Sequence, residues 1–226
     1  VSADKTVTTG GQLSQYVSGM MMAATRLNGT LHIELTDPKE TPYLTMTKQW
    51  LESYGVKVSI SDDFKHIAVT GPVQLKARDC IIPSDWEAVA FPLIASLITK
   101  NSSIVIENVD GSGSQGDDAV VSVLQSVGAD IVWDKKARTL AVYGGKKLTT
   151  QNLPGKELHV NLSGFPDAVC ALAAVACFIE GTTYIEDIGV CRRKETDRIK
   201  VLKSELRKLG ASVDDGSDFL IIHGHA

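Results

Sequence analysis

The chain has 226 residues, of which 43% are hydrophobic and 22% are charged, and its formal net charge is −4 at pH 7. This composition is typical of a globular protein with one or two hydrophobic cores and excludes a disordered chain. Basic residues are dispersed, which argues against nucleic acid as a partner, because binding a phosphate backbone needs a concentrated basic face. No apolar stretch is long enough to span a membrane and the N-terminal sequence lacks a signal core, so we expect a cytoplasmic protein.

The first 82 residues follow the order strand, helix, strand, helix and two further strands. The first helix starts with polar residues after a strand and carries the run Met20–Met22, which we interpret as core filling. The second helix begins at Pro42-Tyr43 and ends at Gly55, and alternating strands follow it. These residues therefore form one candidate domain.

The same order of elements returns at about residues 83–150 and again at 151–226, which together form a second candidate domain. A strand at residues 80–82 leads into the first apolar helix, and residues 158–162 do the same for the second. Gly55, Gly128 and Gly210 each close a helix, and we expect each to adopt the left-handed conformation. The sequence predicts an α/β (α+β) fold of three β-α-β-α-β-β units, with first helices buried on nearly every side.

Polar residues start the first helix of each unit directly after a strand. If the units pack around a common axis, these helix N-termini converge and their backbone N–H groups form an anion-binding face. We interpret Asp85 and Asp117 as N-caps of helices. Asp167 precedes an apolar helix, so its carboxyl group fits either an N-cap or a general base.

The run Lys194–Arg198 (KETDR) has four charged residues out of five at the start of an amphipathic helix. Lys194 and Arg198 can hold a phosphate or carboxylate there together with the helix dipole. Glu195, between cations, stays ionised and can exchange protons with a bound substrate. The alternative is a solvated helix start with local salt bridges. The apolar positions of this helix are Ile199, Leu202, Leu206 and Leu209.

The cysteines show no CxxC spacing and the histidines show no spacing typical of metal ligands. We interpret Cys170 and Cys177, which lie on one apolar helix, as core thiols of a protein in a reducing compartment. We therefore expect no metal site.

Several stretches carry a resemblance to a known family: the repeated unit, the SQYVSGMMMAA helix, the PYLTMT helix start, the GFPDA turn and above all RRKETDRI. Together they resemble the 5-enolpyruvylshikimate-3-phosphate (EPSP) synthase family along essentially the entire chain. The resemblance implies the enolpyruvyl transferase fold, an inverse α/β barrel with two lobes of three units each. By this resemblance, residues 1–82 are the last unit of one lobe, and residues 83–226 are two units of the other.

The resemblance also implies a reaction, the transfer of the enolpyruvyl group of phosphoenolpyruvate to the 5-hydroxyl of shikimate 3-phosphate with release of phosphate. This reaction belongs to the shikimate pathway of aromatic amino acid biosynthesis, and the family uses no metal or organic cofactor for it. Ser14, Gln15 and Tyr43 would hold the phosphate and ring of shikimate 3-phosphate.

The remaining site residues implied by the resemblance lie near the C-terminus. Asp167 would bind the shikimate hydroxyls and take the proton from the attacking oxygen. Lys194 would bridge both substrates, and Arg198 would bind the phosphoenolpyruvate anion. Glu195 would handle the proton at the enolpyruvyl methylene. These roles agree with the anion binding and proton exchange inferred from the residues themselves.

The chain departs from the family pattern at positions that usually carry polar side chains. Leu13, Glu40 and Val190 stand where the family usually has Ser, Ser and Asn. These departures predict weaker phosphate binding, for which Arg192, Arg193 or Lys39 would compensate. Segments that the family uses at the same site are also absent from the sequence. We therefore expect part of an enzyme that is inactive alone, with the two substrates and the missing segments as its partners.

Three other interpretations stay open. The first is a relative of UDP-N-acetylglucosamine enolpyruvyl transferase, which shares the unit and the chemistry but not the KETDR run. The second is a catalytically dead domain that binds a phosphorylated ligand or serves as a scaffold. The third is a structural repeat protein that associates with itself through exposed apolar faces.

Overall fold

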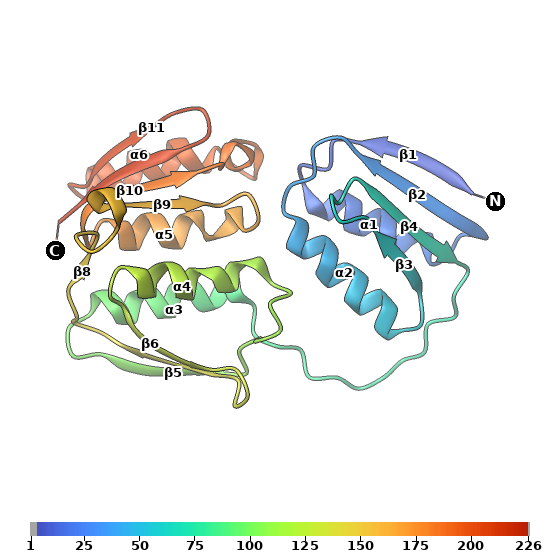
Figure 1. Ribbon diagram of the computed structural model, residues 1–226, viewed down its shortest axis with the longest axis horizontal. Helices are drawn as coiled ribbons and strands as arrows, with labels where there is room; N and C mark the ends of the chain where they lie inside the picture. Colours follow the sequence, from blue (N-terminus) through green and yellow to red (C-terminus); the bar gives the residue numbers. More distant parts are fainter. Residues whose placement is uncertain (1–3, 226) are drawn as a thin grey trace. The chain divides into compact units, whose positions relative to one another are not determined.

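The computed structural model describes residues 4–225. The described chain forms two compact units that divide between Ile82 and Pro83 (Figure 1). No helix within these residues is long and apolar enough to cross a membrane.

The first unit contains one mixed sheet and two helices. Its elements are β1 (Lys5–Thr9), α1 (Ser14–Ala24), β2 (Gly29–Leu35), α2 (Thr41–Ser53), β3 (Lys57–Ile60) and β4 (His66–Gly71). The strand order in the sheet is β1-β2-β4-β3. Strand β1 is parallel to β2, and the other two pairs are antiparallel. This is the predicted β-α-β-α-β-β order.

The core of the first unit lies on one face of this sheet. Along β2, Leu31, Ile33 and Leu35 are buried, whereas the side chains between them are exposed. Helices α1 and α2 cover the buried face (Figure 1). Within the Met20–Met22 run, Met21 is fully buried but Met22 is 54% exposed. Core filling is therefore wrong for Met22, because neighbouring residues on a helix face different directions and α1 buries only one face.

The second unit contains two sheets. The first half consists of α3 (Trp86–Ile98), β5 (Ser103–Glu107), the 3₁₀ turn η1 (Gly116–Asp118), α4 (Ala119–Ser126), β6 (Asp130–Asp134), β7 (Thr139–Tyr143) and β8 (Leu148–Thr149). The second half consists of η2 (Pro154–Lys156), β9 (Glu157–Asn161), η3 (Pro166–Ala168), α5 (Val169–Ala176), β10 (Ile179–Glu186), η4 (Gly189–Arg193), α6 (Arg198–Lys208), β11 (Ser212–Asp215) and β12 (Leu220–Gly224).

The two sheets of the second unit repeat the topology of the first unit. Strands β9, β10, β12 and β11 are neighbours in the same order and directions as β1, β2, β4 and β3, and β8 also pairs with β10. The other sheet, β5-β7-β6, matches the last three of these strands. Helices α3, α4 and α5 lie between the two sheets (Figure 1). Helix α5 is consequently buried on nearly every side, as predicted for the first helix of each unit. The prediction is wrong for α1 and α3, which expose Ala23, Ala88 and Ala95, because each of these helices buries only part of its surface.

The strand predicted at residues 80–82 is wrong. Cys80, Ile81 and Ile82 are exposed and carry no strand, and pairing is reduced to one parallel bridge between Ser84 and Val109. The physical reason is that Pro83 has no N–H group to donate to a ladder. In addition, these residues belong to the segment that carries the chain from one unit to the next. The β5-β7-β6 sheet therefore lacks a first strand.

The ends of the helices follow the predicted signals with one exception. Gly55, Gly128 and Gly210 have φ angles of 81°, 98° and 92°, which confirms the left-handed conformation. Asp85 is the N-cap of α3, because its carboxylate accepts a hydrogen bond from the Glu87 N–H at 3.0 Å. Asp117 is not an N-cap, since it lies inside η1, whose N-cap is Gln115.

Helix α6 buries less of its apolar face than its pattern suggests. Ile199 in its first turn is fully buried, whereas Leu202 and Leu206 are half-buried. Leu209 is 84% exposed, because the helix ends before it. The tightly packed part of α6 is thus its N-terminal turn, which directly follows the KETDR run and includes its last residue, Arg198.

Candidate active site

Three charged side chains meet in the second unit. Asp167 comes from η3, Lys194 from the loop that follows η4, and Arg198 from the start of α6. Arg198, the first residue of α6, donates from Nη1 to Oδ1 of Asp167 at 2.6 Å. The Nζ atom of Lys194 lies 3.4 Å from the same oxygen. The side chains of Lys194, Asp167 and Arg198 are only 11%, 16% and 16% exposed. The fold thus brings one carboxylate and two cations from distant parts of the sequence to a partly buried point.

Glu195 adds a second carboxylate at the outer side of this group. Nη2 of Arg198 donates to Oε2 of Glu195 at 3.0 Å, and the Glu195 side chain is 79% exposed. A hydrogen bond from its own backbone N–H and the bond from Arg198 both lower the pKa of Glu195. It is therefore a carboxylate at neutral pH and is accessible to a molecule that approaches from solvent.

Arg198 is the residue that links the two carboxylates. Burial opposes its charge, but the hydrogen bonds and charges of Glu195 and Asp167 outweigh burial and raise the pKa of Arg198. Arg198 therefore stays charged. An anionic ligand at Arg198 competes with both carboxylates, so the group can exchange an internal ion pair for a bound anion.

Two cysteines lie close enough to Arg198 and Asp167 to interact with their charges. Burial raises the pKa of Cys170, and it raises that of Cys191 to about 12. The Sγ atom of Cys191 donates to the carbonyl oxygen of Pro166 at 3.4 Å, next to Asp167. Both thiols therefore stay protonated and support the packing around Asp167 rather than act as nucleophiles.

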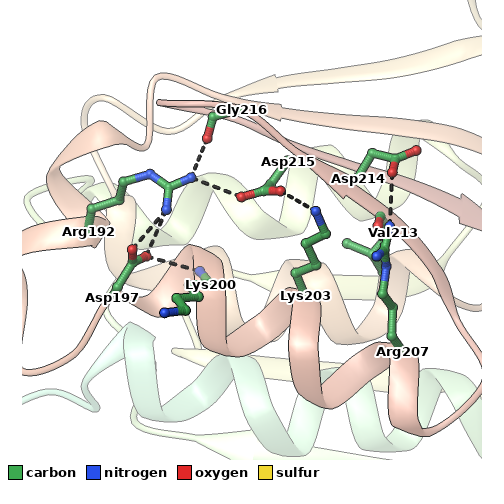
Figure 2. A network of polar contacts seen from close by, with 9 residues as sticks. All are labelled: Arg192, Asp197, Lys200, Lys203, Arg207, Val213, Asp214, Asp215 and Gly216. Atoms are coloured by element: carbon green, nitrogen blue, oxygen red, sulfur yellow. Dashed lines mark hydrogen bonds and ion pairs between the residues drawn. The ribbon is translucent and has the colours of Figure 1, made fainter.

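A polar network anchored by Arg192 holds one end of the loop that precedes α6 (Figure 2). Nη1 of Arg192 donates to both carboxylate oxygens of Asp197, at 3.1 and 2.9 Å. Its Nη2 donates to Oδ2 of Asp215 at 3.0 Å and to the carbonyl of Gly216, and its Nε donates to the carbonyl of Ser217 at 2.8 Å. Every guanidinium nitrogen is thus bound within the protein, which argues against Arg192 as a substitute phosphate ligand.

Asp197 connects this network to the helix. Its Oδ1 atom accepts a hydrogen bond from the Lys200 N–H at 3.0 Å, so Asp197 is the N-cap of α6. Lys194 and Glu195 lie in the loop between Arg192 and Asp197, and the Arg192–Asp197 pair closes that loop. The network therefore positions the two loop residues, and the sequence pattern did not single it out.

The candidate residues of the first unit gather at the starts of α1 and α2. Ser14 is buried, and its N–H and Oγ donate to the same carboxylate oxygen of Glu40, at 2.9 and 2.8 Å. Glu40 is 2% exposed and directly precedes α2. Tyr43 lies half-buried in the first turn of α2, and Gln15 is exposed on α1. The hydroxyl of Ser14 is thus bound to a residue that the sequence indicated only as a departure.

Two other departures also have a structural setting. Leu13 is the N-cap of α1 in an extended conformation, and it offers no side-chain hydrogen bond to the helix. Val190 is buried within η4. Among residues 4–225, no group of three or more His, Cys, Asp or Glu side chains is arranged to hold a metal ion.

The family model of EPSP synthase (3-phosphoshikimate 1-carboxyvinyltransferase) matches residues 6–226. The chain belongs to the EPSP synthase family. A 3-phosphoshikimate 1-carboxyvinyltransferase of Ruminiclostridium cellulolyticum is 34% identical over 209 residues, covering 92% of this chain and 47% of the relative. One of Methanosarcina acetivorans is 32% identical over 213 residues, covering 93% and 48%. The chain spans about half the length of the curated EPSP synthase relatives that it matches.

Solved structures of the EPSP synthase fold match nearly the whole chain. An EPSP synthase from Acinetobacter baumannii has a TM-score of 0.77 and 22% identity over 99% of this chain and 49% of that one. The enolpyruvyl transferase NikO from Streptomyces tendae has a TM-score of 0.71 and 16% identity over 97% and 50%. These likenesses confirm the predicted enolpyruvyl transferase fold, of which this chain forms a part.

One acidic residue near the EPSP synthase family's KETDR run escaped the sequence analysis. Burial, and then the charges of Asp167 and Asp85, raise the pKa of Glu87, although Arg198 and Lys194 oppose this rise. Glu87 lies in the first turn of α3, and α3 packs against η3, which carries Asp167. The sequence did contain one indication of Glu87. It lies in the first turn of a helix whose N-terminus is expected to lie beside the N-termini of other helices.

Proposed function

We propose that the chain is the central-to-late part of an enzyme that transfers the enolpyruvyl group of phosphoenolpyruvate to the 5-hydroxyl of shikimate 3-phosphate and releases phosphate. This reaction would serve the shikimate pathway of aromatic amino acid biosynthesis. Membership of the EPSP synthase family supports the reaction type. The single observation that carries the proposal is the group of Asp167, Lys194 and Arg198, with Glu195 beside it.

In this proposal each residue of the group acts on one part of the reaction. Asp167 takes the proton from the attacking hydroxyl, whose oxygen forms a bond to C2 of phosphoenolpyruvate, and later gives this proton to the released phosphate. Glu195 takes up a proton from solvent when the substrates bind and gives it to C3 in the addition step. Lys194 and Arg198 bind the anionic groups and neutralise the charge of the leaving phosphate. Glu195, ionised in the ligand-free protein, takes the proton back from C3 as the bond from C2 to the phosphate oxygen breaks. No step of this proposal uses a metal ion or an organic cofactor.

On the acceptor side, the proposal assigns shikimate 3-phosphate to Ser14, Gln15 and Tyr43 at the starts of α1 and α2. These residues lie in the first unit, whereas Asp167 and Lys194 lie in the second. Because the chain spans about half of its relatives, we propose that the missing segments of the same enzyme are its partners and that the isolated chain does not turn over. Four thiol cysteines support a reducing, cytoplasmic setting.

A titration of the ¹⁵N-labelled chain with shikimate 3-phosphate, with and without phosphoenolpyruvate, tests the binding part of this proposal. We expect saturable shifts of the amide signals of residues 166–168 and 194–198 when both substrates are present. Asp167→Ala should abolish these shifts. Asp214→Asn, which removes an exposed carboxylate of the same unit, should leave them unchanged. A folded wild-type chain without such shifts would contradict the proposed site.

A phosphate-release assay tests the incompleteness. We expect the chain alone to release no phosphate from phosphoenolpyruvate above background, and steady turnover by the purified chain would overturn that expectation. The hydrogen bonds from Ser14 to Glu40 favour one second candidate, a domain that binds a ligand without turnover. Substrate binding without any activity after the flanking segments of a full-length relative are added would favour this second candidate.

The exposed apolar side chains of the chain support a further partner, a second copy of itself. Tyr16 and Met22 on α1 and Phe91 on α3 are 71%, 54% and 49% exposed. Side chains of this kind on helix surfaces are often covered in an assembly. Sedimentation velocity over a range of concentrations would detect the self-association.

A further inference from the structure

The start of α1 is a position where an anion is favoured. The first N–H groups of a helix lack partners within the helix and carry the positive end of its dipole. In α1 the N-cap is Leu13 and the first residues are Ser14 and Gln15, which carry no charge. A negative charge at this helix start must therefore come from another part of the protein or from a ligand.

Glu40 supplies that charge from within the chain. Its Oε2 atom accepts hydrogen bonds from both the N–H and the Oγ of Ser14, at 2.9 and 2.8 Å. Glu40 and Ser14 are 2% and 4% exposed, so the pair lies inside the first unit rather than on its surface. Hydrogen bonds to a charged acceptor are the stronger kind, and burial reduces their screening.

The backbone around Glu40 shows that this contact is built into the fold. Glu40 is the N-cap of α2, but its side chain does not cap α2 and instead binds the start of α1. Its φ and ψ angles of 54° and 34° are uncommon for a residue other than glycine. On either side, the Lys39 N–H donates to the carbonyl of Gly11 at 3.1 Å, and the Tyr43 N–H donates to the carbonyl of Glu40 at 3.1 Å.

A phosphate at the start of α1 would compete with Glu40 for the N–H and hydroxyl of Ser14. It would also lie next to a buried carboxylate, and like charges at short distance repel strongly where water is excluded. Of the other candidate groups of the first unit, the amide of Gln15 and the ring and hydroxyl of Tyr43 are neutral, and the cation Lys39 already interacts within the protein. Such groups suit the hydroxyls of a ring rather than its phosphate.

We propose that Glu40 is a specificity-determining residue that takes the place of a phosphate at the start of α1. This inference rests on the proposed function and widens its acceptor class to hydroxylated rings without a phosphate. The first unit reads the hydroxylated ring of the acceptor through neutral groups, and the phosphate of the acceptor adds no affinity there. The start of α1 therefore discriminates little between a phosphorylated acceptor and its unphosphorylated form.

The direct test uses inorganic phosphate as the probe and the amide signals of Ser14 and Gln15 as the readout, at constant ionic strength. For the full wild-type chain we expect no saturable shift of these signals. Glu40→Ser removes the carboxylate and restores space, and we expect it to bind phosphate with a saturable shift. The gain should be about tenfold or more in affinity, the size of a favourable charge interaction at a helix N-terminus.

Two further variants keep this test decisive. Glu40→Gln keeps the length of the side chain and an acceptor oxygen but removes the charge, so we expect it to gain phosphate binding as well. It replaces Glu40→Ser in the test if that variant fails to fold. Glu52→Gln removes an exposed carboxylate at the far end of α2, and it should behave as the wild type. A saturable shift at Ser14 in the wild type would overturn the proposal. So would a lack of shifts in every folded Glu40 variant, which would leave Glu40 as a structural link only.

The same variants separate this inference from the proposed function. Inorganic phosphate at Ser14 reports only on the first unit and needs neither phosphoenolpyruvate nor turnover. The proposed function is judged by the response of residues 194–198 in the second unit. If those residues ignore both substrates while Glu40→Ser gains phosphate binding, the proposed function fails and the assignment of Glu40 stands. If residues 194–198 respond to both substrates but no folded Glu40 variant gains phosphate binding, only the assignment of Glu40 is overturned.

Discussion

Asp167 in the second unit and Glu40 in the first each bind the first residue of a helix, but their partners and surroundings differ. Asp167 holds the charged side chains of Arg198 and Lys194, and its side chain is 16% exposed. Glu40 holds the neutral N–H and hydroxyl of Ser14 and is 2% exposed. Both carboxylates have short hydrogen bonds, so hydrogen-bond length does not distinguish them.

The difference lies in what each carboxylate leaves for a ligand. When an anion approaches Asp167, the two cations can turn to it, and Asp167 becomes available to a hydroxyl proton. When an anion approaches Glu40, it meets a carboxylate whose partners at the start of α1 are the neutral N–H and hydroxyl of Ser14. In the two proposals above, one carboxylate therefore prepares a site for anionic ligands, and the other fills such a site. The pairing of charge with charge, rather than burial alone, decides which occurs.

The largest effect that would test this comparison comes from Asp167→Ala. The change leaves the mostly buried cations of Lys194 and Arg198 without their shared partner. We expect the unfolding free energy of the second unit to fall by about 2 kcal/mol, which is less than for a fully buried pair because these side chains keep some exposure to solvent. Urea unfolding, followed by amide signals of the second unit, measures this loss. Asp214→Asn should change it by a few tenths of a kcal/mol at most. Equal losses in both variants would refute a central role for Asp167.

A smaller effect is expected from Arg192→Ala, which removes the anchor of the loop between Arg192 and Asp197 (Figure 2). We expect a loss of roughly 1–2 kcal/mol, because several hydrogen bonds of a half-buried guanidinium disappear. Amide hydrogen exchange of residues 194–198 should become faster, since Asp197, the N-cap of α6, loses its hydrogen bonds from Arg192.

Arg207→Ala is the matched control for Arg192→Ala, because Arg207 also binds the strand β11 but lies outside the loop. It should leave the exchange of residues 194–198 unchanged. If Arg207→Ala speeds exchange as much as Arg192→Ala does, the loop is held by the sheet as a whole rather than by Arg192.

The smallest effect is expected from Glu87→Gln and appears as a pH dependence. The pKa of Glu87 is raised in the folded chain above its usual value of 4.5. The folded state therefore holds this proton more tightly, and stability falls as pH rises from 4.5 through the raised pKa. Glu87→Gln should remove this fall, so the variant should be slightly more stable than the wild type at pH 7 and equal to it below pH 4.5.

Urea midpoints of the second unit at pH 4 and pH 7 measure this difference. Glu107→Gln, an exposed change on β5, serves as the control and should give the same difference between the two pH values as the wild type. A variant Glu87→Gln that is less stable than the wild type at pH 7 would contradict the direction of the pKa shift.

The order of elements could be predicted well from the sequence, because it depends on local signals. The left-handed glycines at 55, 128 and 210 and the alternation along β2 are properties of a few neighbouring residues. The strand at residues 80–82 failed because a strand needs a partner, and partners are set by the path of the whole chain. The exposure of Met22 failed for a related reason, since burial depends on which face of α1 meets the sheet.

The candidate site, like the fold, could be predicted from the sequence only in part. The KETDR run and Asp167 stand out in the sequence, but only as residues of suitable type, and the common role proposed for them came from a family resemblance. The contacts of Glu40 with Ser14 and of Arg192 with Asp215 join residues that are 26 and 23 positions apart. No local pattern indicates such pairs, because a hydrogen bond depends on distance in space and not on distance along the chain.

By itself, the sequence determined the repeated unit, the helix ends and the types of charged residues available, because these follow from the apolar pattern, glycine conformations and side-chain chemistry of short segments. Only the tertiary structure decided which charges meet. It placed Asp167 between two cations and Glu40 against a neutral helix start, and the strength of each contact depends on burial and on partners that the fold alone supplies.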